Sequence, residues 1–219
     1  HYSDEPDETH LTTYCRAREG AAPFLTGCRT MDALSSYAFY ARGLLDIPVV
    51  ATSAAAPFLA NGVSPLWVYY CCAQTRGVCN RFVRMPSYRN RALGFQLYTA
   101  RAAGFLHWGY NDWYNTASAV LIDPFSGEPA DADAYPAGDG YVVYPGADGP
   151  LPSLRQAVFA EALQDRRLCE LAASLSSRDA VLSCLTADGC RFTFDDYPHA
   201  DAPLLTVVSR LKADIAARL

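Results

Sequence analysis

The chain has 219 residues, of which 51% are hydrophobic and 12% aromatic, so it is long enough to bury a substantial core. Its formal net charge of −5 provides no basic surface for nucleic acid or an anionic membrane, and we expect neither as a partner. The apolar stretch at 47–73 is interrupted by Asn61, Gly62 and prolines, so it does not predict a transmembrane helix. The sequence shows no signal-peptide pattern either.

Eight cysteines and four histidines are spread along the chain. They form no Cys-x-x-Cys pair and no clustered histidines, so we expect no metal site and no other cofactor. The chain is also too long and core-rich to depend on a disulfide framework. We therefore interpret the cysteines as free thiols, which favours a reducing compartment and a cytoplasmic over a secreted location. The oligomeric state stays open.

Short apolar runs alternate with amphipathic segments in the first half of the chain. The runs, which are rich in aromatic and β-branched residues and predict strands, are 23–28 (PFLTGC), 47–52 (IPVVAT), 66–72 (LWVYYCC) and 104–110 (GFLHWGY). The segments that predict helices are 8–19, 33–45 and 88–102. Near-continuous apolar strands that alternate with helices are typical of a parallel α/β sheet covered on its faces.

The pattern changes after the last predicted strand. Residues 123–152 contain many Gly, Pro and Asp residues and predict a long structured loop. A phosphate-binding loop is not indicated, because no GxxxxGK[ST] motif follows. Ser153 then predicts the cap of a long helix, and a final helix is predicted over 203–218. The apolar positions of that last helix, which share one face, are Leu204, Val208, Leu211 and Ile215.

The candidate site residues follow from where the predicted strands end. In a parallel barrel, functional groups collect at the carboxyl ends of the strands. Two acids, Asp4 and Glu5, stand side by side after His1-Tyr2-Ser3, which we expect to end a strand. The other residues at or near predicted strand ends are Asp32, Trp67, Tyr69, Tyr70, Trp108, Tyr110 and Asn111.

Carboxylates among Trp and Tyr residues indicate a sugar site. Aromatic rings stack on the apolar faces of pyranoses, and acids transfer protons at the glycosidic oxygen. The alternative for each aromatic side chain is that it fills the core. His107, in the middle of a predicted strand, is interpreted as a hydrogen-bonded structural residue.

The adjacency of Asp4 and Glu5 restricts the mechanism. An ordinary retaining glycosidase holds its two carboxyl groups roughly 5 Å apart across the sugar, usually on separate strands. Neighbouring strand residues point to opposite faces, so both acids reach one ligand only if the strand stops there. Pro6 favours that stop, because it lacks a ladder donor. The pair suits a scheme in which Glu5 protonates the leaving oxygen while Asp4 orients a 2-acetamido group, whose carbonyl oxygen is the nucleophile.

Several motifs, in this order, resemble glycoside hydrolase family 123 and its relatives that carry the domain of unknown function 4091. They run from the first residues to about 171 and are SDEP (3–6), MDAL (31–34), LWVYYCC (66–72), RALGFQLYTARAAGFLHWGYNDW (91–113), DPFSG (123–127) and GDGYVVYPGADGPLPSLR (138–155).

The resemblance implies a (β/α)8 TIM-type barrel and substrate-assisted, retaining cleavage of N-acetyl-β-hexosaminides, in particular N-acetyl-β-galactosaminides, without a metal. It makes Glu5 the general acid/base and Asp4 the residue that orients the acetamido group. It also makes the SDEP strand the fourth of eight. We therefore expect residues 1–171 to form the C-terminal part of the barrel, strands four to eight, with 172–219 as a helical extension packed on the same domain. The earlier strands would belong to another segment of the protein.

One region departs from the family pattern. The helix after Ser153 has Ala157, Ala160, Ala162 and Arg166 where Glu, Arg, Gly and Tyr are expected, which puts the family's interactions of this helix in question. Two other functions stay open: another carbohydrate-active hydrolase in which Glu5 works with a different partner, and a non-catalytic carbohydrate-binding or structural barrel.

Overall fold

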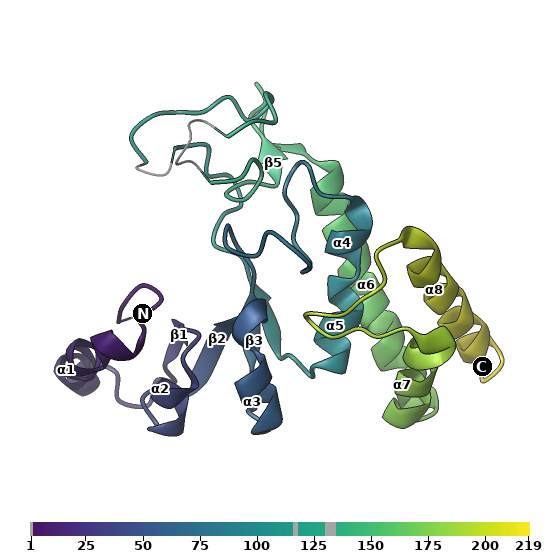
Figure 1. The fold of residues 1–219 in the computed structure, drawn as a ribbon, viewed down its shortest axis with the longest axis horizontal. Helices are drawn as coiled ribbons and strands as arrows, with labels where there is room; N and C mark the ends of the chain where they lie inside the picture. The colour runs from purple at the N-terminus through teal and green to yellow at the C-terminus, as the bar shows by residue number, and fades with distance from the viewer. Residues whose placement is uncertain (1, 116–117, 130–134) are drawn as a thin grey trace. The chain divides into compact units, whose positions relative to one another are not determined.

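The computed structural model of the protein describes residues 2–115, 118–129 and 135–219. The chain divides into two compact units. Unit 1 comprises the chain up to Tyr70 together with Ala100–Leu106, and unit 2 comprises Cys71–Thr99 and His107–Leu219. Each unit is described by itself, and Figure 1 gives the element labels.

Unit 1 contains a four-stranded sheet in which neighbouring strands lie side by side (Figure 1). All three strand pairs are parallel, and Val50 pairs with Val68, which pairs with Phe105 on its other side. The strands, in sheet order, are β1 (Met31–Ala33), β2 (Ile47–Ala51), β3 (Trp67–Tyr69) and β4 (Gly104–Leu106). The predicted parallel α/β class is therefore confirmed, whereas the described strands form an open sheet and not a closed barrel.

The strand predicted over 23–28 is wrong. Pro23 lies in a short 3-10 helix, and the next backbone hydrogen bonds, Leu25 N to Ala22 O (3.2 Å) and Cys28 N to Leu25 O (2.9 Å), are those of successive turns. Phe24 is 86% exposed, so the apolar run is not a buried strand. The strand begins at Met31 instead, which places Asp32 within β1 and not after a strand.

The helices of unit 1 are short. The helix predicted over 8–19 is confirmed, and the one predicted over 33–45 is reduced to its middle part, because Gly43 (φ +66°) turns the chain. Tyr14 and Phe39 meet edge to face, with ring centroids 5.0 Å apart, in a small core. The elements are η1 (Glu8–His10), α1 (Leu11–Ala21), η2 (Ala22–Phe24), α2 (Tyr37–Ala41), η3 (Thr52–Ala54) and α3 (Ala56–Ala60).

Unit 2 is mainly helical. The predicted helix 88–102 is present as two shorter helices, and both predicted helices of the C-terminal part are confirmed, the first with Ser153 Oγ accepting from Gln156 N (3.2 Å). The elements are α4 (Ser87–Arg91), α5 (Leu93–Thr99), β5 (Val143–Tyr144), β6 (Leu151–Pro152), α6 (Leu154–Leu175), α7 (Arg178–Thr186), η4 (Ala187–Gly189) and α8 (Asp201–Ala216).

Helix α6 is the centre of unit 2. It approaches α5 so closely that a Cβ at Gly94 would lie 1.9 Å from the carbonyl oxygen of Ala162. It is also tied to α4 by a two-pronged ion pair, in which Arg91 Nε and Nη2 lie 2.8 and 3.2 Å from the carboxylate oxygens of buried Asp165. The expected boundary after residue 171 falls within α6, and α7 and α8 share the hydrophobic core of α5 and α6.

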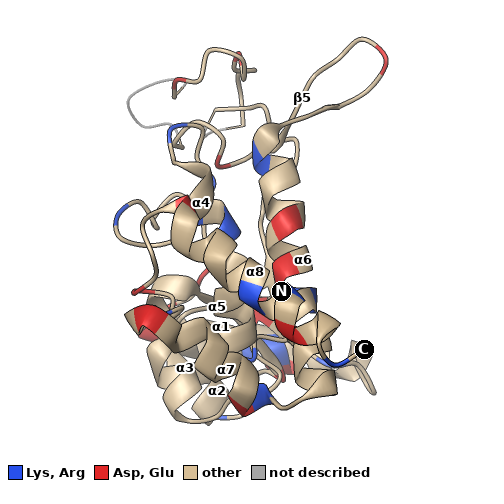
Figure 2. Cartoon of the chain, turned by 90° about the vertical axis from the view of Figure 1, so that its right-hand side faces the viewer, with Lys and Arg blue, Asp and Glu red and all other residues tan. Residues whose placement is uncertain are grey.

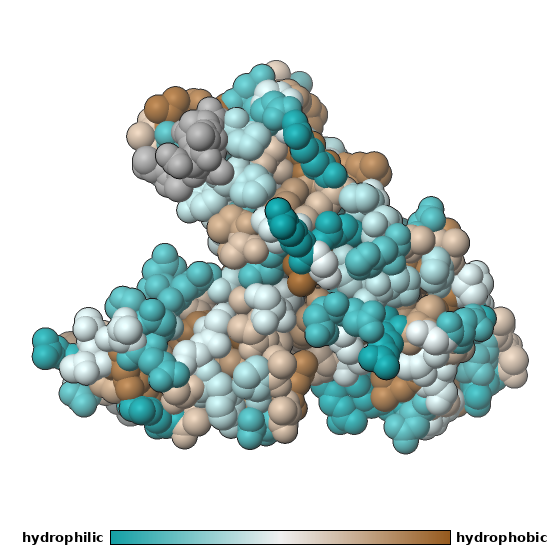
Figure 3. All heavy atoms as spheres, in the orientation of Figure 1, coloured by the Kyte–Doolittle hydropathy of each residue, from teal (hydrophilic) through white to brown (hydrophobic). Residues whose placement is uncertain are grey.

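The surface carries charges of both signs. Acidic and basic residues are interspersed along α6 (Figure 2), and hydrophilic and hydrophobic residues are intermingled on the face drawn in Figure 3. None of the described helices combines the length and the apolar character needed to cross a membrane. All eight cysteines are free thiols, and burial raises the pKa of Cys169 to about 12.

Candidate active site

The segment with the paired acids precedes η1 without forming a strand. The expectation that Tyr2-Ser3 ends a strand is wrong for the described residues, because the Tyr2 N–H donates to a side chain, Asp32 Oδ2 (2.8 Å), rather than to a neighbouring strand. The side chains of Asp4 and Glu5 are exposed, while Pro6 is buried. The acids therefore lie on a surface segment anchored at both of its sides.

Glu5 has an unusual backbone and a specific partner. Its φ of +41° lies in the left-handed region, which costs a non-glycine residue about 1–3 kcal/mol and is found most often at functional sites. The hydroxyl of Tyr69, at the end of β3, donates a hydrogen bond to Glu5 Oε1. Two of the predicted site residues, 64 positions apart in sequence, are thus in direct contact.

Asp32 serves as the anchor of this segment. It is only 2% exposed, and its carboxylate accepts hydrogen bonds from the backbone N–H of Ala33 (3.1 Å) and the hydroxyl of Tyr14 (3.1 Å), in addition to that of Tyr2. Burial, together with the Asp32 charge, raises the pKa of Tyr14 far above its usual value, so this hydroxyl stays a donor. Sequence reasoning missed Tyr14, which follows SDEP on α1.

The other two predicted residues of unit 1 support the sheet. The half-buried indole of Trp67 lies against Gly104, where a Cβ would be 2.3 Å from the ring. Tyr70 is fully buried, and its ring meets that of Phe105 at 4.8 Å with an angle of 61° between the planes. Within unit 1, these two side chains therefore hold β3, the strand that carries Tyr69, against its neighbour β4.

The three remaining predicted residues lie in unit 2, on an exposed stretch after β4. Trp108 is 43% exposed and Tyr110 51%, and Asn111 is exposed as well. The stretch pairs with a second segment, since Val142 N donates to Tyr110 O (2.9 Å) and Asn111 forms an antiparallel bridge with Tyr141. This pairing holds two exposed aromatic rings on a fixed backbone.

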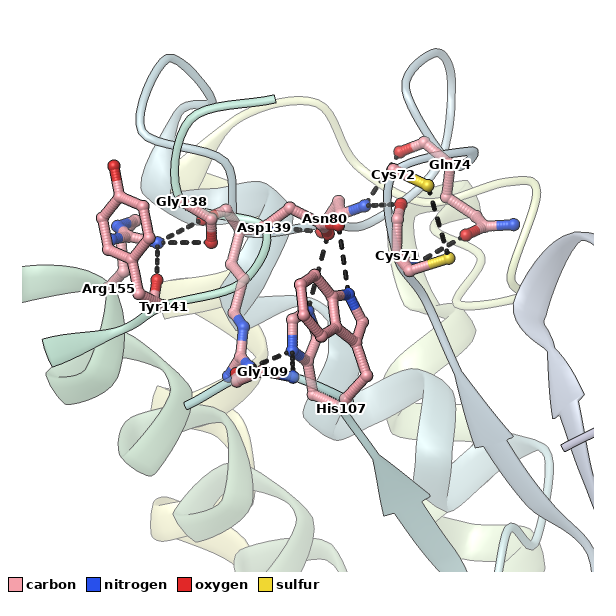
Figure 4. Close-up of polar contacts among 12 residues, drawn as sticks. Cys71, Cys72, Gln74, Asn80, His107, Gly109, Gly138, Asp139, Tyr141 and Arg155 are labelled. Atoms are coloured by element: carbon pink, nitrogen blue, oxygen red, sulfur yellow. Dashed lines mark hydrogen bonds and ion pairs between the residues drawn. The ribbon is translucent and has the colours of Figure 1, made fainter. Parts of the chain in front are cut away.

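A buried polar network lies behind this stretch (Figure 4). Asp139 is fully buried and accepts a hydrogen bond from Trp108 Nε1 (3.1 Å), and burial raises its pKa to about 6. His107 Nε2 lies 3.8 Å from Asp139 Oδ1, and burial, with the nearby Arg81 charge, lowers the pKa of His107 to about 3. His107 Nδ1 is 3.0 Å from Gly109 O, which confirms His107 as a buried hydrogen-bonding residue.

Aromatic rings also line a small hollow of unit 2. Trp108 and Tyr135 lie with ring centroids 5.1 Å apart at its wall. Asp112 and Tyr114 also line this hollow, as does Tyr141, which is buried and whose hydroxyl donates to Pro124 O (3.2 Å). Over the described part of the chain, His, Cys, Asp and Glu side chains form no group of three or more that could hold a metal ion.

Unit 1 thus has a pair of exposed acids, one of them bonded to a tyrosine of the sheet, and unit 2 separately has exposed aromatic rings. Residues 1–172 match the family described as "Glycoside hydrolase 123, catalytic domain". The chain belongs to this family. A comparison with curated proteins gives no match.

The fold is similar to a solved family 123 glycoside hydrolase from Clostridium perfringens, whose structural analysis concerns the details of glycolipid glycan hydrolysis. The TM-score is 0.59 at 14% sequence identity, over 98% of this chain and 39% of the other. This chain therefore spans about two fifths of that protein's length, and the similarity shows a shared fold.

Proposed function

We propose that the protein is a glycoside hydrolase that cleaves N-acetyl-β-hexosaminides, N-acetyl-β-galactosaminides in particular, with retention of configuration. The observation that carries the proposal is the exposed Asp4-Glu5 pair, with Glu5 held by the Tyr69 hydroxyl, in a chain of family 123. In this proposal the four-stranded sheet is part of a (β/α)8 barrel, to which residues 1–171 contribute and on which 172–219 form an extension.

The substrate supplies the nucleophile in this mechanism. The carbonyl oxygen of its 2-acetamido group attacks the anomeric carbon while the bond to the leaving oxygen breaks, and Glu5 gives its proton to that oxygen. Asp4 accepts a hydrogen bond from the acetamido N–H and orients the group. Water then attacks the same carbon, which breaks the bond to the acetamido oxygen and regenerates the acetamido group, and Glu5 takes the proton from the water.

The local backbone supports this division of roles. Successive side chains in an extended segment point to opposite sides, which would separate the two carboxylates. The left-handed conformation of Glu5 departs from extended geometry, and the Tyr69 hydroxyl fixes one carboxylate oxygen of Glu5. Asp32 acts on the pair indirectly, because it holds the backbone of Tyr2.

Sugar contacts are assigned to the exposed aromatic stretch. Trp108 and Tyr110 would stack on apolar sugar faces, and Asn111 would bind hydroxyl groups. Trp67 and Tyr70 would contribute by supporting Tyr69, since one is half-buried and the other fully buried. The partner of the protein is thus a glycan that contains N-acetylhexosamine.

The proposal is tested with the full-length protein and two aryl glycosides, an N-acetyl-β-galactosaminide and the matching β-galactoside without the acetamido group. We expect the protein to hydrolyse the N-acetyl-β-galactosaminide and not the β-galactoside. Glu5→Gln should reduce that turnover by a factor of about 10²–10⁴. Glu19→Gln, a substitution of an exposed glutamate on α1, is the matched control and should leave turnover unchanged. Equal turnover of both glycosides would refute substrate assistance.

A further inference from the structure

Trp108 combines an exposed ring with a buried hydrogen bond. Trp108 is 43% exposed, yet its indole Nε1–H donates a hydrogen bond to Asp139 Oδ2 at 3.1 Å, and Asp139 itself is fully buried. A surface indole is free to change rotamer unless a second contact holds it. The hydrogen bond that the indole donates to a charged acceptor inside the protein is such a contact, because hydrogen bonds to ionised groups are among the strongest.

The backbone around Asp139 leaves little space for any other position of the ring. A Cβ at Gly140 would lie 2.8 Å from Cη2 of Trp108, so the outer edge of the indole touches the chain directly after Asp139. A Cβ at Gly109 would lie 2.4 Å from Gly140 O, and Asp112 N donates to that same oxygen at 2.9 Å. The backbone segments after Trp108 and after Asp139 therefore lie in direct contact at Gly109, Asp112 and Gly140.

Asp139 is expensive to bury where it lies. Its remaining contacts are the backbone N–H of Cys72 and the ring of His107 at 3.8 Å, and the nearby Arg81 directs Nη2 to Gly109 O (3.2 Å). Removing a carboxylate from water costs free energy, and buried titratable groups of this kind are concentrated at functional sites. Its position behind Trp108 indicates which side chain it serves.

We propose that Asp139 is a positioning residue, which holds the indole of Trp108 as a rigid stacking platform for a pyranose ring of the substrate. The inference rests on the proposed function for the identity of the ligand, a sugar with an apolar face, and on the contacts above for the role of Asp139. The ring of Tyr135, whose centroid lies 5.1 Å from that of Trp108, extends the aromatic surface beside the platform.

The kinetic test is a double-mutant cycle in the full-length protein on the aryl N-acetyl-β-galactosaminide. Asp139→Leu should raise KM about ten-fold and change kcat less, as for the loss of one hydrogen bond to a charged group. Asp139→Asn, which keeps an acceptor oxygen, should restore most of the affinity. In the Trp108→Phe background, Asp139→Leu should raise KM by less than about two-fold, because the interaction is already gone. An equal effect of Asp139→Leu in both backgrounds would overturn the proposal.

A second measurement does not depend on turnover. In protein labelled with ¹⁵N-tryptophan, the indole N–H signal that disappears in Trp108→Phe should exchange slowly with water in the wild type and faster in Asp139→Leu. The signal of Trp113, whose Nε1 donates to Val143 O (3.0 Å), is the internal control and should not change. An unchanged Trp108 signal would overturn the positioning role. If that signal responds while the wild type does not hydrolyse the galactosaminide, the positioning role stands and the proposed substrate is wrong.

Discussion

Replacing Asp139 with Asn should change how stability depends on pH. Burial raises the pKa of Asp139 from 3.8 to about 6 in the folded protein, so the folded state binds this proton more tightly than the unfolded chain does. The free energy of unfolding should therefore fall as pH rises from 4 to 6, by about 3 kcal/mol for a shift of about two pKa units. Asn does not titrate, so the variant lacks this loss.

His107 works in the opposite direction, which makes the test specific. Its pKa is lowered from 6.5 to about 3, so below pH 6.5 the unfolded chain binds a proton that the folded protein does not. Stability from this residue is complete above pH 6.5 and lost progressively as pH falls toward 3. In the wild type the two effects oppose one another between pH 4 and 6.

Urea unfolding followed by circular dichroism at pH 4, 5, 6 and 7 measures these effects. Asp139→Asn should gain about 3 kcal/mol relative to the wild type between pH 4 and 7, with a steeper loss of stability in acid. His107→Gln should show the reverse, a flatter acid limb. A difference between Asp139→Asn and the wild type that is constant across this range would refute the assignment of a raised pKa to Asp139.

Three further substitutions test the framework of each unit. Asp32→Ala removes the acceptor of the Tyr2 and Ala33 N–H groups and of the Tyr14 hydroxyl, so it should lower the free energy of unfolding in urea by about 3 kcal/mol and also lower kcat. An unchanged kcat would contradict the anchoring role of Asp32. Arg91→Ala should cost about 3–5 kcal/mol, because Asp165 stays buried without its cation, and Arg91→Ala with Asp165→Leu should recover much of that loss. Gly94→Val should prevent α5 from packing on α6 and lower the melting temperature by at least about 5 °C, so a wild-type melting curve would argue against the close approach.

Sequence patterns correctly predicted the strands in which successive residues are buried. The runs at 47–52 and 66–72 contain β2 and β3, because their apolar residues really do face a core on both sides of the sheet. The run at 23–28 has a similar composition, but Pro23 and Phe24 belong to the 3-10 helix η2, Gly27 turns the chain at φ +79°, and Phe24 is exposed to solvent. Composition over six residues does not distinguish these two cases.

The site was predictable as far as it depends on residue type. Adjacent acids and exposed aromatic residues are visible in the sequence, and the contact between Tyr69 and Glu5 joins two residues chosen from it. The hydrogen bonds that hold these residues in place were not predictable, because they join positions far apart in the sequence: Tyr14 with Asp32, and Trp108 with Asp139. Asp139 lies in a Gly-rich stretch whose sequence predicts a loop, and only the structure shows that its carboxylate is buried.

The left-handed backbone at Glu5 bears on how such proteins change over evolutionary time. Glycine adopts this conformation without strain, so Glu5→Gly should relieve the backbone strain while it removes the proposed acid and its hydrogen bond to Tyr69. In a lineage released from selection for catalysis, relief of this strain and loss of the acid would coincide at this one codon. Persistence of a glutamate here in a descendant would then indicate continued selection for its carboxylate, because the backbone conformation by itself favours glycine.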